Sequence, residues 1–431
     1  MLNKIKNIIF KTDRFLFKKF GSDKSLKYLE NLKEANIIFS FLNYNNTESK
    51  VKFVGGCIRK SLLGQIVDDI DLATTLEPDE VKKRLIKNGI KVIDTGILHG
   101  TITAIINKKK FEITTLRKDI LTDGRHAKIK YTLNWEEDSF RRDFTINAIY
   151  SDIDGRVFDP QNGISDLENG IIRFIGSAEE RIKEDYLRIL RYFRFFIEYS
   201  KTDYDKNTIK YIKQNINGLN KVSNERIFIE LKKILSLQNV NKLFLNTQSK
   251  EIILNIFPQF KFYERLNKIE NLEEKLKINY DSDLILALLI IDQSNNYEYF
   301  CHKYKTSNNM RNRFKNISKH FEEIKNKSFF SEKNIKRSVY FLDKKYVKDL
   351  LFFSICLNNK IEISKIKKLI GFINNFKIPK FPISGDELKN KYGYESGELL
   401  GKKLKDLEKK WIENNFFIDD KEVEKSLNKF N

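Results

Sequence analysis

The distribution of glycine constrains this fold more than any other feature of the sequence. Of the eighteen glycines, twelve lie at or before Gly176, and none lies between Gly218 and Gly371. Glycine suits the tight turns between strands and destabilises helix interiors. We therefore expect a sheet with many turns in the first part of the chain and nearly uninterrupted helix in the rest. The length of 431 residues suffices for two to four domains.

Short β-branched segments alternate with turn signals before about residue 177, a pattern typical of strands. Helices are expected at residues 57–63 and after Pro78. From Ala178 onward apolar residues recur three and four positions apart, which predicts helices. The fold class is therefore α+β, with a mixed sheet in the N-terminal domain and an all-helical remainder. The predicted strands are VKFV, IDLATT, KVIDTG, TITAII and FEITTL, followed by YSDI and RVFD on either side of an Asp154-Gly155 turn.

The charge balance favours a polyanionic partner. The chain has 80 Lys and Arg against 59 Asp and Glu, a formal net charge of +21, and such an excess is typical of proteins that bind nucleic acid. The alternative is a bias of composition, because Lys, Asn and Ile are abundant along the whole chain.

The sequence favours a cytoplasmic protein that does not associate with membranes. Three cysteines, far apart and without CxxC spacing, indicate neither a disulfide framework nor a zinc site. Lysines interrupt the apolar runs of the N-terminal stretch MLNKIKNIIFKTDRFLFKKF, so this stretch lacks the apolar core of a signal peptide. No apolar span of 18 residues occurs. We expect the N-terminal stretch to form a helix that packs on the first domain, and an interfacial amphipathic helix is the alternative.

A glycine pair, Gly55-Gly56, lies between a predicted strand and a predicted helix. Glycine lets a ligand approach the backbone, and the start of a helix attracts anions. Arg59, one turn into the predicted helix, adds a charge that suits phosphate. The pattern predicts phosphate binding, and the alternative is a structural tight turn.

Two aspartates occupy alternate positions in the stretch DDIDLATT. Asp69 and Asp71 would project from one face of a strand, while Ile70 and Leu72 face the core. Adjacent carboxylates repel each other, and a hard divalent cation such as Mg²⁺ relieves the repulsion while taking further ligands from substrate phosphates. Glu112 in KKFEITTL is a candidate third carboxylate from a neighbouring strand. The alternatives are a solvated acidic turn for the aspartates and a surface position on an edge strand for Glu112.

Two later stretches combine arginine with acidic residues. The stretch WEEDSFRRDFTINAIY places Arg142 ahead of a predicted amphipathic helix. Farther on, an acidic residue and three arginines recur every three positions, which predicts one slowly turning stripe on a helix. The alternative is a ladder of Asp–Arg pairs within that helix. The four residues are Asp185, Arg188, Arg191 and Arg194.

The order of six motifs resembles that of the class II tRNA nucleotidyltransferases and bacterial poly(A) polymerases: GG, DxD, HGT, a DGR loop, RRDFTINA and EDxxRxLRxxRF. Residues 53–75, 96–119, 136–150 and 171–196 carry the resemblance. It implies five segments along the chain. They are an N-terminal extension at 1–25, a catalytic nucleotidyltransferase head at 26–177, a helical neck for base recognition at 178–240, a helical body at 241–375 and a tRNA-binding helical tail at 376–431.

The resemblance also implies roles for the residues singled out above. Asp69 and Asp71 would hold two Mg²⁺ ions, and with Glu112 they form the expected catalytic set. A second set would bind the nucleotide, with Asp185 and Arg188 facing the edge of the base. This set is Gly55, Gly56, Arg59, Arg142, Asp185, Arg188, Arg191 and Arg194.

The implied activity is template-independent addition of CCA to tRNA 3′ ends from CTP and ATP, with release of pyrophosphate and no obligate protein partner. Residues 118–134 resemble the flexible loop of enzymes that add the terminal A. A poly(A) polymerase or A-adding enzyme of the same fold is the first alternative, and a catalytically silent RNA-binding protein is the second. The chain departs from the family at two positions. Lys60 stands where an Asp usually follows the arginine of GGxxR, and Ala127 replaces the usual proline of the loop.

Overall fold

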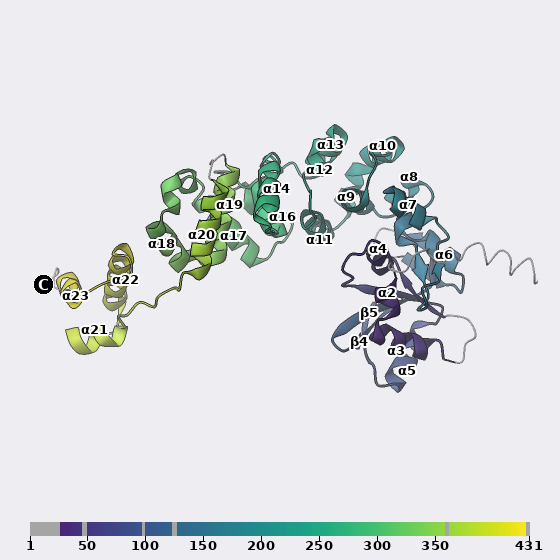
Figure 1. The fold of residues 1–431 in the computed structure, drawn as a ribbon, viewed down its shortest axis with the longest axis horizontal. Coiled ribbons are helices and arrows are strands. Elements are labelled where there is room, and N and C mark those ends of the chain that lie inside the picture. The colour runs from purple at the N-terminus through teal and green to yellow at the C-terminus, as the bar shows by residue number, and fades with distance from the viewer. Residues whose placement is uncertain (1–25, 45–49, 97–99, 123–126, 358–361, 428–431) are drawn as a thin grey trace, which may run out of the picture. The chain divides into compact units, whose positions relative to one another are not determined.

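A computed structural model describes residues 26–44, 50–96, 100–122, 127–357 and 362–427 (Figure 1). The expected N-terminal extension lies outside the described residues. The chain divides into two compact units, Met1–Leu231 and Lys232–Asn431. All described strands belong to the first unit, which contains the expected head and most of the expected neck, and the second unit is helical. The predicted α+β class is therefore confirmed, and the finer division into head, neck, body and tail stays a prediction.

The head is built on a seven-stranded sheet in the order β3-β4-β5-β2-β1-β8-β9. Strands β2 and β5 run parallel, and every other neighbouring pair is antiparallel. The sheet is therefore mixed, and each predicted strand segment takes part in it. The strands are β1 (Val51–Val54), β2 (Ile70–Thr74), β3 (Lys91–Gly96), β4 (Thr101–Ile106), β5 (Lys109–Thr115), β8 (Tyr150–Ser151) and β9 (Val157–Phe158).

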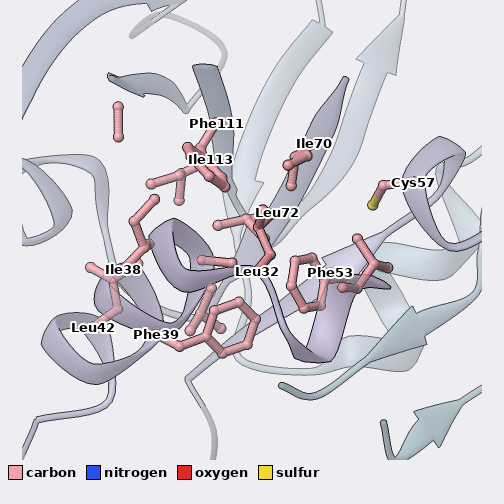
Figure 2. Packing of buried hydrophobic residues seen from close by; sticks show 14 of the residues in the cluster. Leu32, Ile38, Phe39, Leu42, Phe53, Cys57, Ile70, Leu72, Phe111 and Ile113 are labelled. Carbon is pink, nitrogen blue, oxygen red and sulfur yellow. The ribbon is translucent and has the colours of Figure 1, made fainter. Parts of the chain in front are cut away.

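Helices cover one face of this sheet and bury its apolar side chains. In Figure 2, Phe53 of β1 and Leu72 of β2 lie in the same apolar cluster as Phe39 of the covering helix α3. Successive strand residues point to opposite faces, so the strand residues next to these core positions face the other side of the sheet. The helices that contribute to this cluster are α2 (Lys27–Glu30), α3 (Lys33–Leu42), α4 (Gly56–Leu62) and α5 (Pro78–Lys87).

A separate two-stranded sheet occupies most of residues 118–134. It pairs β6 (Arg117–Thr122) with β7 (Ala127–Tyr131) in antiparallel fashion, and residues 123–126 lie outside the described part. The strands were not predicted from the sequence, because polar and apolar residues mix here without the apolar run that marked the other strands.

Two predictions about helices are wrong. After Arg142 the structure has only a 3-10 turn, η2 (Thr145–Asn147), instead of an amphipathic helix. The reason is local: the Asp143 carboxylate accepts hydrogen bonds from the Phe144 N–H (2.9 Å) and the Asn147 amide (2.8 Å). Side-chain bonds of this kind compete with helical ones.

The expected stripe of Asp185 and three arginines is also not continuous. Helix α8 (Ala178–Glu184) ends before Asp185, and α9 (Arg188–Tyr199) begins after it. Asp185 has an extended backbone, and its carboxylate accepts a hydrogen bond from the Leu187 N–H (3.2 Å). The carboxylate thus bonds the backbone of the turn between α8 and α9, where the helical run is broken.

The remaining helices of the first unit complete the head and the neck. They are α6 (Trp135–Phe140), α7 (Gly163–Asn169), α10 (Lys206–Asn215), η3 (Ile216–Lys221) and α11 (Asn224–Leu235), whose last residues extend past the boundary between the units. None of the helices in the described ranges is long and apolar enough to cross a membrane.

The second unit packs its helices around buried apolar residues and one buried arginine. Arg313 donates hydrogen bonds to Asp349 (2.6 and 2.7 Å) and to Asp281 (2.7 and 2.8 Å). Its helices are α12 (Lys242–Leu245), α13 (Thr247–Ile256), α14 (Arg265–Leu276), α15 (Ser282–Ile290), α16 (Asn296–Lys303), α17 (Asn308–Lys319), η4 (Glu323–Lys325), η5 (Lys327–Phe330), α18 (Glu332–Leu342), α19 (Lys344–Cys356), α20 (Ile363–Asn375), α21 (Gly385–Tyr392), α22 (Glu398–Glu413) and α23 (Asp420–Leu427).

Candidate active site

The sheet face away from the covering helices carries the predicted carboxylates; we call it the site face, defined by Asp71, Ala73, Glu112 and Tyr150. Asp71 of β2 and Glu112 of β5 are direct partners in the parallel register, so their side chains leave the sheet on the same side. Asp69 is exposed and lies just before β2, which begins at Ile70. The structure therefore places two of the three carboxylates on adjacent strands and the third two residues away.

The edge-strand interpretation of Glu112 is wrong. Strand β5 lies inside the sheet, between β4 and β2. The Glu112 side chain is nevertheless exposed, because the site face is open at this point. Its position beside Asp71 agrees with the predicted third carboxylate, and its part in catalysis stays a prediction.

The three carboxylates form no hydrogen bond or ion pair through their side chains with the described residues. The pKa of Asp71 is raised to about 6, chiefly by burial and then by the negative charge of Glu112, against the opposing charge of Arg142. A largely buried carboxylate without a partner is unfavourable in its charged form. A bound cation would remove this cost.

The donor set fits a divalent metal that shares its ligands with a substrate. Within the described ranges, no group of three or more His, Cys, Asp or Glu side chains is arranged to hold a metal by itself. Asp69 and Asp71 offer hard carboxylate oxygens, which suit a cation that keeps waters and takes phosphate oxygens as its other ligands. Two protein ligands with an open remainder are therefore a chemically sensible set.

The glycine pair brings the backbone close to the site face. Gly55 has a φ of 73°, in the left-handed region, and begins the turn into α4. A Cβ at Gly55 would lie 3.5 Å from the Asn147 carbonyl oxygen and 3.8 Å from an Arg142 nitrogen. A larger residue at Gly55 would be strained by this φ, although its Cβ would meet both groups only at ordinary van der Waals distances. The structure thus brings Gly55 close to Arg142, and the role of both in binding a nucleotide stays a prediction.

Arg59 joins α4 to the neck helix α9. The side chain is buried, with 5% of the residue exposed, and its guanidinium lies 4.9 Å from the ring centre of Phe195 and 4.8 Å from that of Tyr199. It also donates a hydrogen bond to the Asn147 side chain. These contacts connect α4 to α9 through Arg59. Its contact with a nucleotide stays a prediction.

Arg142 is held by a buried acid that the sequence did not point out. It donates to Asp138 (3.1 Å) and to the Tyr150 hydroxyl (3.0 Å), and that hydroxyl donates to Asp138 (2.8 Å). Burial alone would raise the pKa of Asp138, but the charges of Arg141 and Arg142 lower it to about 2. The carboxylate is therefore charged and fixes the guanidinium of Arg142 beside the site face.

Each neck residue of the expected nucleotide set has a charged partner. Asp185 pairs with Arg226 of α11 (2.7 Å), so the alternative of an Asp–Arg ladder within one helix is wrong. The three arginines pair with acids from other positions. The pairs are Arg188–Glu184, Arg191–Asp143 and Arg194–Glu230, each at 2.5 Å.

These partners differ in how far the sequence could have revealed them. Asp138 and Glu184 precede Arg142 and Arg188 by four residues, a spacing at which charged side chains meet on a helix. Asp143 and Arg191 are separated by 48 positions, and no spacing rule connects them. Burial alone would raise the pKa of Asp143, but the charge of Arg191 and the Asn147 hydrogen bond hold it well below its usual range.

The structure supplies a partner for Lys60, one of the two departures from the family pattern. Its ammonium forms an ion pair with Asp68, and the same Asp68 oxygen accepts a hydrogen bond from the Asp69 N–H (3.2 Å). The hydrogen bond from Lys60 is the main cause that lowers the pKa of Asp68. Lys60 therefore ties α4 to the segment that carries Asp69.

Restoring the family residue should impair this chain. In Lys60→Asp the new carboxylate would face Asp68, so we expect kcat/KM for nucleotide addition to fall about fivefold, the effect of turning an exposed attraction into repulsion. The double variant K60D/D68K should recover most of the loss. Lys83→Asp, which changes the same charge at an exposed position of α5, is the control. A K60D variant as active as wild type would contradict the expectation.

Comparison with known proteins identifies the parts of the chain. Residues 51–173 match the model of the poly A polymerase head domain, residues 203–263 that of the probable RNA and SrmB-binding site of polymerase A, and residues 276–423 that of a putative tRNA nucleotidyltransferase domain 2. Together with the mixed sheet and the carboxylates of the site face, the head match defines the class of protein, a nucleotidyltransferase.

Curated relatives extend over nearly the whole chain. The Homo sapiens CCA tRNA nucleotidyltransferase 1, mitochondrial, is 34% identical over 416 residues, 92% of this chain and 89% of that protein. The CCA-adding enzyme of Streptococcus sanguinis is 32% identical over 364 residues, 83% of this chain and 87% of that enzyme. The chain belongs to the family of CCA tRNA nucleotidyltransferases and is an enzyme of that family.

Solved structures share the fold. The Bacillus stearothermophilus CCA-adding enzyme in complex with CTP superposes with a TM-score of 0.67 at 23% identity, over 89% of this chain and 93% of that chain. The Thermotoga maritima CCA-adding enzyme complexed with tRNA superposes with a TM-score of 0.62 at 22% identity, over 95% of this chain and 99% of that chain.

Proposed function

We propose that the chain adds C, C and A to the 3′ ends of tRNA without a nucleic-acid template, using CTP and ATP and releasing pyrophosphate. One observation carries this proposal: on the site face of a nucleotidyltransferase head, carboxylates without a side-chain partner in the described part of the chain lie near an arginine fixed by Asp138. The names of the two relatives, a CCA tRNA nucleotidyltransferase and a CCA-adding enzyme, support the same reaction. So do the CTP and tRNA complexes of proteins with this fold.

The head residues would act by positioning and by charge. Asp69 and Asp71 would hold a divalent metal, proposed as a pair of Mg²⁺ ions, with Glu112 as a third carboxylate beside them. When bound, Mg²⁺ would lower the pKa of the attacking 3′-hydroxyl and neutralise the negative charge of the triphosphate. Arg142, fixed by Asp138, would contact the nucleotide, while Gly55 leaves room for it.

The other residues of the proposed nucleotide set lie at the start of α4 and in α9. Gly56 begins α4, and a Cβ there would lie 3.9 Å from an Arg59 nitrogen. We propose that Gly56 and Arg59 contact the triphosphate. Arg191 and Arg194, each paired with an acid, would support the neck helix or reach the phosphates.

Asp185 and Arg188 would read the edge of the incoming base. A carboxylate accepts hydrogen bonds and a guanidinium donates them, so the pair can complement the edges of C and A. Discrimination by hydrogen bonding is strong because a wrong base leaves polar groups unpaired. The ion pairs of these residues to Arg226 and Glu184 support this role, because they hold both side chains in defined positions.

The helical segments would bind tRNA through its phosphates and shape. The net charge of +21 supports this. We propose the body at 241–375 and the tail at 376–431 as these segments, the neck at 178–240 for base recognition, and no obligate protein partner. We also propose that the protein acts in the cytoplasm. Because the human relative is named mitochondrial, cell fractionation is the test of location.

The activity is tested by incubating the protein with Mg²⁺, labelled CTP or ATP, and tRNA that lacks one, two or three terminal nucleotides. Growth to CCA followed by a stop supports the proposal. Long A tails on unrelated RNA would instead identify a poly(A) polymerase, which shares the head domain. No incorporation with any of the three substrates would leave an RNA-binding protein without this activity.

A further inference from the structure

Arg181 of α8 is a largely buried arginine outside the set expected to bind nucleotide. One nitrogen of its guanidinium donates to the backbone carbonyls of Phe140 and Arg142, the latter at 2.7 Å. The other terminal nitrogen donates to the Glu184 carboxylate (2.5 Å). Arg181 therefore contacts the head segment that carries Arg142 and, at the same time, the end of its own helix.

Glu184 extends this path to Arg188. The same Glu184 oxygen accepts from Arg188 (2.5 Å), and Arg188 also donates to the backbone carbonyl of Arg181 (2.8 Å). A continuous chain of charged hydrogen bonds thus runs from the Arg142 backbone through Arg181 and Glu184 to Arg188. Its two ends are the residues proposed to contact the nucleotide in the head and the base in the neck.

Arg188 needs such an anchor because it begins a new helix. Helix α8 ends at Glu184 and α9 begins at Arg188, so the helical backbone is interrupted between Arg181 and Arg188. The hydrogen bonds of the Arg188 side chain across this break connect the first residue of α9 to α8. Their loss would leave the start of α9 held by the backbone hydrogen bond from the Arg188 N–H to the Asp185 carbonyl (2.9 Å) and by the packing of its apolar residues.

The network of Arg181, Glu184 and Arg188 is poorly suited to stabilising the fold. One carboxylate serves two guanidinium groups, and the buried Arg181 Nε has no hydrogen-bond partner among the described residues. Burial and the nearby Arg188 charge both lower the pKa of Arg181. A buried charge network is weak evidence for stabilisation, and its better-supported use is to specify one arrangement of the groups around it.

We propose that Arg181 is a positioning residue that fixes Arg188 relative to Arg142 and thereby sets which base the site accepts. The inference rests on the proposed function, because it assumes that Arg142 and Arg188 face the nucleotide. Arg181 itself acts through its neighbours and need not touch the substrate.

The test compares Arg181→Met and Arg181→Lys with Lys183→Met, which removes an exposed ion pair from the same helix. The purified full chain is assayed on tRNA lacking its terminal nucleotides, with kcat and KM measured separately for CTP, ATP and UTP. We expect R181M to lose roughly 10- to 100-fold in kcat/KM for CTP, the worth of one or two charged hydrogen bonds. Because the base edge is misread, the preference for CTP over UTP should fall about tenfold.

The conservative variant separates positioning from folding. R181K keeps the charge and can reach Glu184 but cannot bond both sides at once, so we expect partial recovery of CTP selectivity and a melting temperature close to that of wild type. Glu184→Gln should add little loss on top of R181M, because both changes break the same path. K183M should match wild type in every measurement.

Two results would overturn the inference. One is an unchanged CTP to UTP preference in R181K and R181M. The other is an equal loss for all nucleotides that simply follows a lower melting temperature. If R181M does not fold, the selectivity of R181K alone decides. Wild-type protein that adds no nucleotide would contradict the proposed function instead, so the two failures are distinguishable.

Discussion

Replacing Asp71 with asparagine is expected to abolish nucleotide incorporation while tRNA binding stays near that of wild type. Asp71 lies in β2 opposite Glu112, and its side chain has no partner among the described residues to replace a bound cation. Asparagine keeps the shape of the aspartate side chain and removes its charge. The rate of nucleotide incorporation should therefore fall by at least about 1000-fold, as for loss of a metal ligand in phosphoryl transfer. Asp69→Asn should behave alike.

The measurement is single-turnover incorporation of labelled ATP, with tRNA binding followed in parallel by filter retention. Titration with Mn²⁺ observed by electron paramagnetic resonance gives a readout that does not depend on turnover, and we expect weaker binding in both variants. Asp94→Asn, an exposed acid of β3, is the matched control. Incorporation within tenfold of wild type by both Asp69 and Asp71 variants would disprove the assignment.

The same substitution separates function from stability. Without divalent metal, Asp71→Asn should unfold at the temperature of wild type or above it. The amide removes the repulsion with Glu112 that helps to raise the pKa of Asp71. A variant that is inactive and also less stable would indicate a folding defect instead.

The second large effect is expected from Asp138→Ala. Asp138 is fully buried and accepts bonds from Arg141 (2.7 Å), Arg142 (3.1 Å) and Tyr150 (2.8 Å). Removing it leaves two largely buried cations without their carboxylate, which costs about 3–5 kcal/mol of unfolding free energy. Urea unfolding at neutral pH, read by circular dichroism, measures the loss. Asp154→Ala removes an exposed ion pair of the same head and should cost under about 1 kcal/mol.

Lowering the pH should reduce the difference in unfolding free energy between wild type and Asp138→Ala. The folded-state pKa of Asp138, about 2, lies below its ordinary value of 3.8. The carboxylate's contribution is therefore fully present above the ordinary value and is lost as pH falls toward the folded value. The two unfolding free energies should converge between about pH 4 and pH 2. A constant difference across this range, or a loss below about 1 kcal/mol at neutral pH, would contradict the role of the Asp138 charge.

The alternation of side chains along a strand allowed most of the correct predictions about the site. Leu72 enters the apolar cluster and Asp71 faces away from it, as alternation requires. The glycine pair could likewise be placed between a strand and a helix. In each case the relevant neighbours are within a few residues, where backbone geometry alone decides direction.

Helix continuity was the weakest prediction. The spacing of Asp185 and Arg188 suits one helix face, yet Asp185 is extended and accepts a hydrogen bond from the Leu187 N–H in the turn between two helices. Likewise, Asp143 bonds its own neighbours and turns the following residues into η2. Both failures have one cause: a short acidic side chain that bonds the backbone locally competes with the helix, and residue spacing does not report this competition.

The sequence by itself determined which residues share a strand face, that the chain after the sheet domain is largely helical, and which family the motifs resemble. The tertiary structure decided the partners: Glu112 beside Asp71, Arg191 on Asp143, and Lys60 on Asp68. The physical reason is range. Local backbone geometry repeats every two or 3.6 residues, whereas strand order and the pairing of distant charges depend on how the apolar cluster of the head packs, and that is set by the whole chain at once.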